Sequence, residues 1–287
     1  MGEKAESAGQ GGWVAKAAAG RSLDEQIAAV REQGNHGAPS VLRAMALAAS
    51  GLGQPARTAP SALVFGCYRP FSTPYVVRDA AELLTRLGVG FTWLEKEYCC
   101  GLPLLHQGGK ERAGEVLGVA REALLANRDN AAAKGATRLV YCCAGCAHAA
   151  KGALPESAGD HVYILDALLD ALGTRPLAVA PRRLAYFEGC HASYRKPFPD
   201  AGLDWPRYRR FLDGLAGLEV VDAPRNLCCK VAADKIVSWV AAQGLDELVC
   251  ACSGCNVALR QAAAGRDRPM RVKSSLELLS EALGAAS

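Results

Sequence analysis

The sequence has little of what marks membrane, secreted or nucleic-acid-binding proteins. Only 6% of its 287 residues are aromatic, and it has no apolar run of the roughly eighteen residues that a membrane-spanning helix needs. The first residues include Glu3 and Glu6 and no compact apolar stretch, so we expect no signal peptide. The net charge of +4 is too small to indicate a dedicated nucleic-acid binder.

Two cofactor-binding signatures are also missing. No G-x-G-x-x-G opens a helix after an expected strand, so we expect no flavin or nucleotide of the chain's own. The run C-x-x-C-x-x-C-x-x-x-C-P of a cubane ferredoxin site is absent as well. Electrons for any redox reaction must therefore come from another protein.

The composition indicates a globular protein with an unusual use of cysteine. Half of the residues are hydrophobic and 22% are charged, and the length suits one large domain or two ordinary ones. Twelve cysteines in this length are too sparse for a small disulfide scaffold. We expect a cytoplasmic protein, where clustered cysteines more often bind metal or act in catalysis than form structural disulfides.

Ten of the twelve cysteines form one pattern that occurs twice. Each copy has a single cysteine, then an adjacent pair, then a C-x-x-C. The first copy contains Cys67, Cys99, Cys100, Cys143 and Cys146, and the second contains Cys190, Cys228, Cys229, Cys252 and Cys255. Cys142 and Cys250 fall outside the pattern, and we interpret them as small buried residues at strand ends.

The hydrophobic pattern between the cysteines predicts alternating strands and helices, repeated in the two halves. We expect an α/β fold of two tandem, pseudo-symmetric repeats, each with a small parallel sheet flanked by helices. The expected helices include one from Lys110 to about Asn127 in the first repeat and one over 206–218 in the second. The first repeat is predicted at 61–178 and the second at 179–287. Residues 1–60 form an N-terminal leader that we expect to be partly flexible, with a helix that begins at a Ser22–Glu25 capping box. The role of this leader does not follow from the sequence.

Each cysteine group directly follows an expected strand. Ligands gather at the carboxyl ends of parallel strands, so the fold should bring the five thiols of each repeat to one sheet edge. Thiolate groups select zinc, copper(I) or iron–sulfur clusters. Structural zinc usually takes two C-x-x-C knuckles and four ligands, whereas each repeat offers five thiols and one C-x-x-C.

The order Cys … Cys-Cys-Gly … Cys-x-x-Cys, present twice, resembles the cysteine-rich CCG domain. Within heterodisulfide reductase it resembles the subunit designated B, and it is similar to related iron–sulfur redox subunits. The resemblance covers roughly residues 61–287. It implies that the ten patterned cysteines hold two non-cubane [4Fe-4S] clusters. It further implies an oxidoreductase subunit that reduces or oxidises a disulfide or related sulfur compound. A flavoprotein or a ferredoxin-like iron–sulfur subunit would be its partner, and it would meet a membrane only through partners.

The second copy departs from the pattern in two ways. Lys230 stands where the first copy has Gly101, and only 22 residues separate Cys229 from Cys252, against 42 between Cys100 and Cys143. Losing the glycine could change how closely the backbone approaches the ligand.

Disulfide chemistry also requires protons at the leaving thiolates. His191, directly after Cys190, and His106, six residues after Cys100, are the candidate donors. His148 lies close to Cys146 and is a third candidate.

Two other functions remain open from the sequence. The chain could be an electron-relay subunit of a respiratory dehydrogenase complex of the glycerol-3-phosphate, lactate or succinate type, as similar CCG proteins are. It could also be a zinc-stabilised scaffold without redox activity. Iron and acid-labile sulfide content distinguishes the scaffold from the two redox functions.

Overall fold

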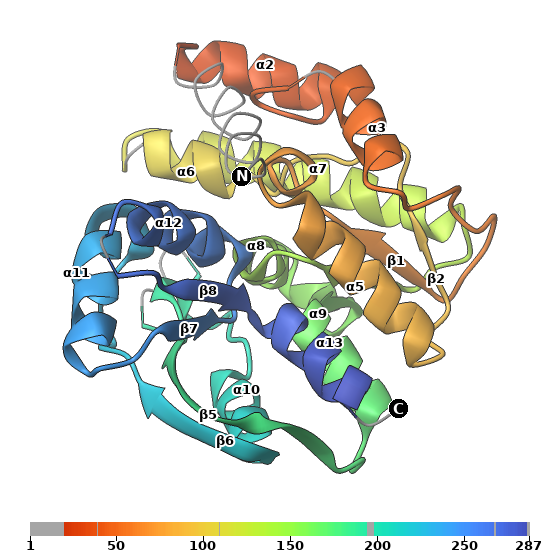
Figure 1. The fold of residues 1–287 in the computed structure, drawn as a ribbon. Coiled ribbons are helices and arrows are strands. Elements are labelled where there is room, and N and C mark those ends of the chain that lie inside the picture. Colours follow the sequence, from red (N-terminus) through yellow and green to blue (C-terminus); the bar gives the residue numbers. More distant parts are fainter. Residues whose placement is uncertain (1–19, 39, 109, 194–197, 267, 286–287) are drawn as a thin grey trace. The chain divides into compact units, whose positions relative to one another are not determined.

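The structure is a computed structural model that describes residues 20–38, 40–108, 110–193, 198–266 and 268–285 (Figure 1). The leader residues 1–19, expected to be flexible, lie outside the described residues. The described residues divide into two compact units. The first lies within Met1–Ile164 and Pro197–Ala201, and the second within Leu165–Lys196 and Gly202–Ser287.

Each unit contains one four-stranded parallel sheet, and the two sheets have the same topology. The strand order is β2-β1-β3-β4 in the first and β6-β5-β7-β8 in the second, with every neighbouring pair parallel. The repeated parallel α/β fold expected from the sequence is therefore confirmed. In both sheets the first strand of the repeat is central. The second strand pairs with it at one edge, and the third and fourth strands add on its other side.

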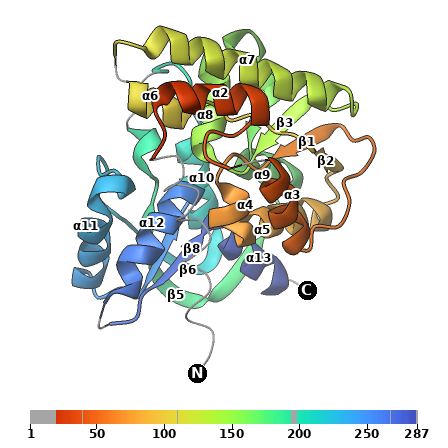
Figure 2. The same ribbon diagram turned by 90° about the horizontal axis from the view of Figure 1, so that it is seen from above.

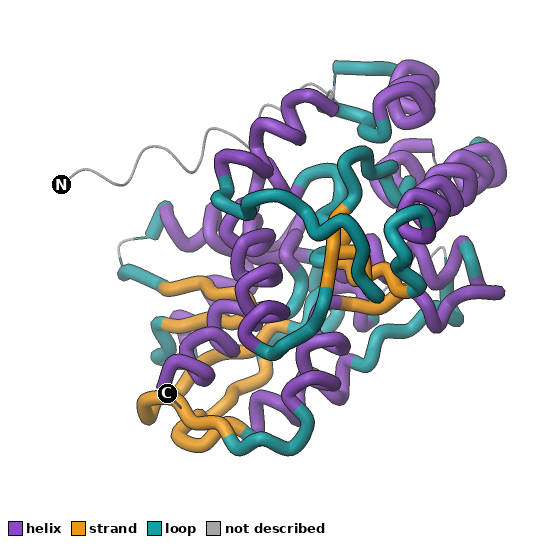
Figure 3. The backbone as a smooth tube through the Cα atoms, turned by 90° about the vertical axis from the view of Figure 1, so that its right-hand side faces the viewer, coloured by secondary structure: helices purple, strands orange, loops and turns teal. Residues whose placement is uncertain are grey.

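The strands Ser61–Val64, Arg138–Tyr141 and Glu247–Cys250 are short and mostly buried, as expected for strands covered by helices on both faces. The longer strand Leu215–Asp222 is buried only at Leu215. The first sheet comprises β1 (Ser61–Val64), β2 (Phe91–Trp93), β3 (Arg138–Tyr141) and β4 (His161–Tyr163). The second comprises β5 (Leu177–Phe187), β6 (Leu215–Asp222), β7 (Glu247–Cys250) and β8 (Arg271–Ser274). Figure 3 shows these strands in orange among the purple helices.

The helices follow the strands as crossover connections. In the first half they are α2 (Leu23–Gln33), α3 (Ser40–Ala49), α4 (Arg69–Ser72), α5 (Pro74–Arg86), α6 (Leu102–Gly108), α7 (Ala113–Ala132), α8 (Ala144–Ala153), the 3₁₀ helix η1 (Pro155–Asp160) and α9 (Ile164–Leu172). In the second half they are η2 (Cys190–Ala192), α10 (Trp205–Asp213), α11 (Cys229–Ala242), α12 (Ser253–Ala264) and α13 (Ser275–Ala285). No helix in these described ranges is long and apolar enough to cross a membrane.

The described part of the leader is structured and packs on the first repeat. Helix α2 begins at Ser22, whose side chain accepts from the backbone N–H of Glu25 while the Glu25 carboxylate accepts from the Ser22 N–H. The predicted capping box is therefore confirmed. The apolar face of α2, which includes Ile27 and Val30, joins a core with residues of α6 and α7. Figure 2 shows α2 lying beside these two helices.

Two expectations about local structure were wrong. The helix expected over 206–218 ends at Asp213 as α10, because the following Leu215–Asp222 pairs with β5 as a strand. The single helix expected from Lys110 is preceded by a separate short one, α6, so the first repeat has two helices between its cysteine pair and its next strand. The second repeat has only α11 at that point, which accounts for its shorter spacing.

Candidate metal centres at the cysteine-bearing sheet edges

The cysteines of each repeat lie beyond the carboxyl ends of its strands. In the first sheet β1 and β3 are paired neighbours, and the chain reaches β3 only after passing through β2 at the edge. The loops after β1 and β3 therefore leave in opposite directions, which is the arrangement that gathers ligands at the strand ends of parallel sheets. Cys67 follows β1, and Cys143 follows β3. Pairing of β5 with β7 places Cys190 and Cys252 equivalently in the second repeat.

In the first repeat, successive contacts link all five patterned thiols into one row. Cys67 interacts with Cys99, Cys99 with Cys100, Cys100 with Cys146, and Cys146 with Cys143. The sulfurs come from three loops that are up to 76 residues apart in the sequence, counted from Cys67 to Cys143. We call this group site one.

The thiol pKa values in site one alternate along the chain. Hydrogen bonds from Cys99 and Cys146 lower the pKa of Cys67 and of Cys143, each to about 6, and lower that of Cys100 as well. The pKa values of Cys99 and Cys146 are raised, because these two thiols donate to thiolate neighbours. Site one therefore alternates thiols of lowered pKa, at Cys67, Cys100 and Cys143, with S–H donors at Cys99 and Cys146, a setting that suits thiolate ligation.

Glycine permits close approach to the sulfurs in both repeats. Gly66, directly before Cys67, has φ +86°, and a Cβ there would lie 3.2 Å from Cys146 Sγ. Gly189, directly before Cys190, has φ +101°, and its Cβ would lie 3.3 Å from Cys255 Sγ. Any larger residue at either position would crowd the sulfurs, which fits a site built to hold a bulky ligand.

Helix N-termini also point at the sulfurs. Cys143 is the N-cap of α8 and Cys252 is the N-cap of α12, so Cys146 and Cys255 lie in the first turns. Cys228 similarly caps α11. The partial positive charge and unpaired N–H groups of a helix N-terminus favour thiolates, so these residues fit a thiolate-ligated metal or cluster.

All twelve cysteines are free thiols, and the two outside the pattern differ from the rest. Cys142 and Cys250 are at most 1% exposed, and burial raises the pKa of both above its usual value. Cys250 accepts a hydrogen bond from Asn256 Nδ2 and donates to the Lys273 carbonyl, each at 3.6 Å. Both remain protonated, as small buried side chains at strand ends.

A buried ion pair supports site one. The Glu97 carboxylate accepts from the N–H groups of Phe65 and Gly66, both at 2.9 Å, and lies 2.7 Å from a guanidinium nitrogen of Arg43. Both side chains are about 5% exposed or less. Arg43 also donates to the carbonyls of Leu94 and Glu95. This pair fixes the turn before Cys67 to the loop before Cys99.

The loop that carries Cys99 and Cys100 is also hydrogen-bonded to α7 and to the end of α2. The Asn127 amide, on α7, accepts from the Tyr98 N–H at 2.7 Å and donates to the Tyr98 carbonyl at 2.8 Å. The Cys99 N–H donates to the carbonyl of Gly34, at the end of α2, at 2.7 Å. Gly34 has φ +77°, and a Cβ there would lie 2.1 Å from the Glu97 carbonyl oxygen. Site one thus depends on α7 and on the leader.

The structure explains why the second pair lacks its glycine. Gly101 has φ +77°, and a Cβ there would lie 2.4 Å from the Cβ of Ala120 on α7. The second repeat has no second helix at this point, and α11 begins at Cys229 itself. Lys230 is therefore an ordinary helical residue that needs no glycine, and the difference reflects packing against α7 and not approach to the sulfurs.

In the second repeat the thiols also converge, in a more open setting. Cys190 interacts with Cys228, and Cys255 interacts with Cys229 and Cys252. Cys190 and Cys228 are partly exposed, whereas their counterparts Cys67 and Cys99 are buried. Burial and the neighbouring Cys228 raise the pKa of Cys190 to about 12. We call this group of five cysteines site two.

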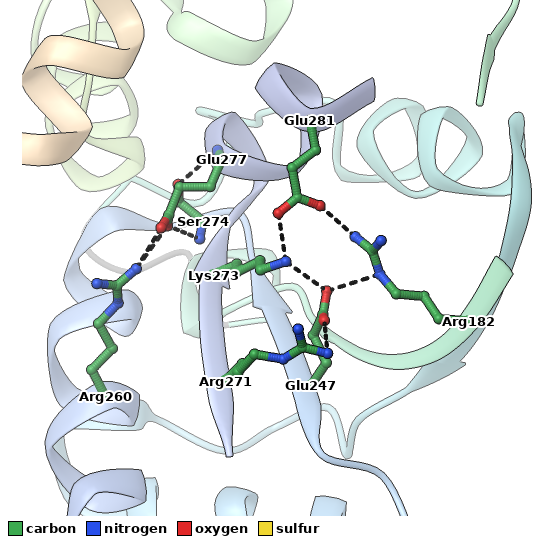
Figure 4. Close-up of polar contacts among 8 residues, drawn as sticks. All are labelled: Arg182, Glu247, Arg260, Arg271, Lys273, Ser274, Glu277 and Glu281. Atoms are coloured by element: carbon green, nitrogen blue, oxygen red, sulfur yellow. Dashed lines mark hydrogen bonds and ion pairs between the residues drawn. The ribbon is translucent and has the colours of Figure 1, made fainter. Parts of the chain in front are cut away.

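The buried ion network of the second unit lies away from its cysteines. Glu247, at the start of β7, is 1% exposed and pairs with Arg182, Arg271 and Lys273, while Glu281 bridges two of these cations (Figure 4). Because Glu247 lies at the amino end of β7 and Cys250 ends that strand, the network stabilises the edge opposite site two.

The predicted proton donors lie in different settings. His106 is exposed near the end of α6, and His191 is partly exposed in η2, directly after Cys190. Both remain predictions. His148 is 1% exposed and donates from Nδ1 to the Ala201 carbonyl at 2.7 Å, which is a structural contact.

Sequence reasoning missed four residues that contact the cysteines of site one or the loops that carry them, namely His36, Arg43, Glu97 and Asn127. His36 lies with Cys67 and Cys99 in a group whose ligand atoms are all within 4.8 Å of one another. The one available signal was that the chain has only five histidines and that His36 lies in a Gly-Asn-His-Gly turn.

Comparison with known proteins agrees with this geometry. Residues 62–150 match the family model described as a cysteine-rich domain, CCG. This range contains all five cysteines of site one, and the resemblance expected from the sequence is confirmed.

Curated relatives match larger parts of the chain. The chain is 28% identical over 249 residues to the subunit designated D in the dihydromethanophenazine:CoB–CoM heterodisulfide reductase of Methanosarcina mazei, covering 76% of this chain and 58% of the relative. It is 26% identical over 183 residues to the subunit designated C in the anaerobic glycerol-3-phosphate dehydrogenase of Escherichia coli K12, covering 60% of this chain and 43% of the relative. The chain thus spans little more than half the length of the first relative.

Solved structures offer only a weak likeness. An Asp/Glu racemase structure from Yersinia pestis covers 79% of this chain and 99% of its own, at 13% identity and a TM-score of 0.36.

Proposed function

We propose that the chain is an iron–sulfur redox subunit in which site one and site two each hold a [4Fe-4S] cluster of the non-cubane kind. The ligands would be the ten patterned cysteines. The observation that supports this most directly is the unbroken chain of five sulfurs in site one, because tetrahedral zinc uses only four ligands. The cradle at Gly66 and the thiolate-favouring environment fit the same ligand.

The reaction that we propose is the reduction of a disulfide or related sulfur compound, or its reverse. Cleavage of the S–S bond takes two electrons and two protons and yields two thiols. An iron–sulfur cluster supplies electrons one at a time, so two sites in one chain match the demand of one disulfide. The electrons would come from a flavoprotein or ferredoxin-like partner subunit, and we place the complex in the cytoplasm.

Within this proposal the chain's own residues position and protect the sulfurs. Glu97 and Arg43 hold the Cys67 turn, and Asn127 and Gly34 hold the loop of the adjacent pair. His191 and His106 are proposed to deliver protons to the leaving thiolates. His191 is the stronger candidate, because it directly follows the partly exposed Cys190.

An electron-relay subunit of a respiratory dehydrogenase is the second candidate. It is favoured by the 26% identity to the anaerobic glycerol-3-phosphate dehydrogenase relative. In that case the two sites would pass electrons between partners, and the chain would bind no disulfide. Disulfide reductase activity with a chemical electron donor separates the two functions.

The deciding experiment measures iron, zinc and acid-labile sulfide per chain on anaerobically purified protein. We expect about eight irons and about eight sulfides, the content of two [4Fe-4S] clusters. About four irons would mean that one site is empty and would favour the relay. Zinc without sulfide would overturn the redox proposal and leave a scaffold.

Cysteine variants assign the iron to each site. Cys99→Ser and Cys229→Ser should each remove about half of the iron, because each deletes a ligand of one repeat only. Cys142→Ser is the matched control outside the pattern and should retain all of it. Full iron content in Cys99→Ser would contradict the assignment of site one.

A further inference from the structure

A turn of the leader reaches into site one from more than thirty residues upstream of Cys67. It consists of Gly34, Asn35 and His36, directly after α2. Asn35 and His36 are at most 4% exposed. The turn lies outside the residues matched to the cysteine-rich family model, which begins at residue 62.

The turn is fixed in place by its own hydrogen bonds. Asn35 Nδ2 donates to the Cys67 carbonyl at 2.8 Å, and Asn35 Oδ1 accepts from the N–H groups of Gly37 and Ala38. The Gly34 carbonyl accepts from the Cys99 N–H. The backbones of two patterned cysteines are thus bound to the two residues that precede His36, so the imidazole has a defined position.

Both ring nitrogens of His36 have partners. Nδ1 lies 3.6 Å from Cys99 Sγ, and Nε2 lies 2.5 Å from the Tyr68 hydroxyl. The two rings also meet edge to face, with centroids 4.9 Å apart. Among the described residues, this is the one place where a histidine and two cysteines lie with their ligand atoms within 4.8 Å of one another.

The chemistry of Cys99 decides which nitrogen bears the proton. A cysteine that is a cluster ligand is a thiolate, which can accept a hydrogen bond and cannot donate one. A hydrogen bond to it therefore requires a proton on Nδ1 of His36. In the neutral ring Nε2 is then an acceptor, and the Tyr68 hydroxyl donates to it. Tyr68 thus satisfies the second ring nitrogen in the tautomer that points an N–H at the sulfur.

We propose that His36 is a positioning residue of site one, whose Nδ1–H donates a hydrogen bond to Cys99 Sγ and raises the reduction potential of the first cluster. The inference rests on the proposed function, because it requires a cluster at site one. A hydrogen bond to a ligand sulfur withdraws electron density from it and favours the reduced cluster. The donor comes from the leader, which gives this otherwise unassigned segment a role in setting the potential of site one.

The test is a redox titration of the full-length, anaerobically purified chain, followed by electron paramagnetic resonance. The signal that disappears in Cys99→Ser is assigned to site one. His36→Phe keeps an aromatic ring against Tyr68 and removes the donor, so the site-one potential should become more negative. The site-two potential should stay unchanged, which provides an internal control.

Two further variants separate hydrogen bonding from packing. His36→Asn places an amide N–H close to the position of Nδ1 and should bring the potential back toward the wild-type value. Tyr68→Phe removes the hydroxyl that donates to Nε2 and holds the ring in place, and should shift the potential in the same direction as His36→Phe but by less. Iron content should be unchanged in all three.

The contrary outcomes are distinct. If His36→Phe retains full iron and an unchanged site-one potential, the inference is overturned while the proposed function stands. If His36→Phe and His36→Asn both lose about half of the iron, His36 is a metal ligand and the hydrogen-bond role is wrong. If the wild-type chain has no iron and sulfide, the proposed function fails first, and this inference fails with it.

Discussion

Site one and site two have the same topological frame and differ in what surrounds it. The order of strands, the glycine before the lone cysteine and the helix that begins at the C-x-x-C are common to both. Site one is in addition enclosed by α7 and by the leader turn, whereas Cys190 and Cys228 of site two are partly exposed. The shared strand topology brings five thiols together in each repeat. In site one, α7 and the leader turn also reduce the solvent exposure of the cysteines and hydrogen-bond to the loops that carry them.

This difference predicts unequal chemistry in two repeats with the same cysteine pattern. Fewer water contacts and more hydrogen-bond donors act on the sulfurs of site one, and both factors influence the potential of a bound cluster. Site two is the more accessible of the two groups of thiols.

The largest expected difference is in thiol reactivity of the metal-free protein. Cys143 and Cys190 are both partly exposed, but their pKa values are about 6 and about 12. Thiolate is the reactive form, although its nucleophilicity falls with its pKa, so at pH 7 we expect iodoacetamide to modify Cys143 about a hundredfold faster. Its rate should level off above about pH 7 and fall as pH drops through 6, which mass spectrometry can follow.

Cys146→Ala is the matched control for that measurement. The Cys146 thiol donates the hydrogen bond that is the main cause of the low Cys143 pKa. Removing it should slow modification of Cys143 at pH 7 and leave Cys190 unchanged. Equal rates at Cys143 and Cys190 in the parent protein would remove this distinction between the sites.

The next largest effect concerns the buried carboxylates. Arg43→Met leaves Glu97 buried without its cation and should reduce the free energy of unfolding by about 3 kcal/mol. Lys273→Met in the second unit should reduce it by about 1 kcal/mol, because Glu247 retains Arg182 and Arg271. Urea unfolding of the two variants measures both. A loss of less than about 1 kcal/mol for Arg43→Met would contradict the dependence of Glu97 on its cation.

The glycine after the first cysteine pair gives a smaller, steric test. Gly101→Ala combines a left-handed backbone with a clash against Ala120 and should reduce stability by about 3 kcal/mol or slightly less. Gly88→Ala, which has φ +72° and open space, isolates the backbone contribution of about 1 kcal/mol. Lys230→Ala should change stability by less than about 0.5 kcal/mol. Equal losses at Gly101 and Gly88 would exclude packing against α7 as the reason for the glycine.

A further test of about 1 kcal/mol asks whether the leader helix supports site one alone. Ser22→Ala removes the capping box of α2 and should reduce stability by about 1 kcal/mol, with faster hydrogen exchange at the Cys99 N–H. Asp204→Ala removes the matching cap of α10 and should affect only the second unit. If the Cys99 amide exchanges at its original rate in Ser22→Ala, the leader does not stabilise the loop of site one.

Much of the fold could be predicted because its signals are local. Short apolar segments followed by cysteines marked the strands, and the capping box marked the start of α2. The prediction failed at 206–218, where the end of a helix is determined by pairing of the next residues with β5. It also missed α6, which begins directly after the turn at Gly101 that packs against Ala120.

The sequence by itself determined that five cysteines recur twice in one order, each group after a strand, and so specified a parallel fold with thiols at one edge of each sheet. Only the tertiary structure decided that His36, Arg43 and Asn127 surround site one and that the second repeat lacks this enclosure. The physical reason is distance along the chain. Strand–cysteine order is a local pattern, whereas contacts between residues about thirty or more positions apart form only when the packed core brings them together.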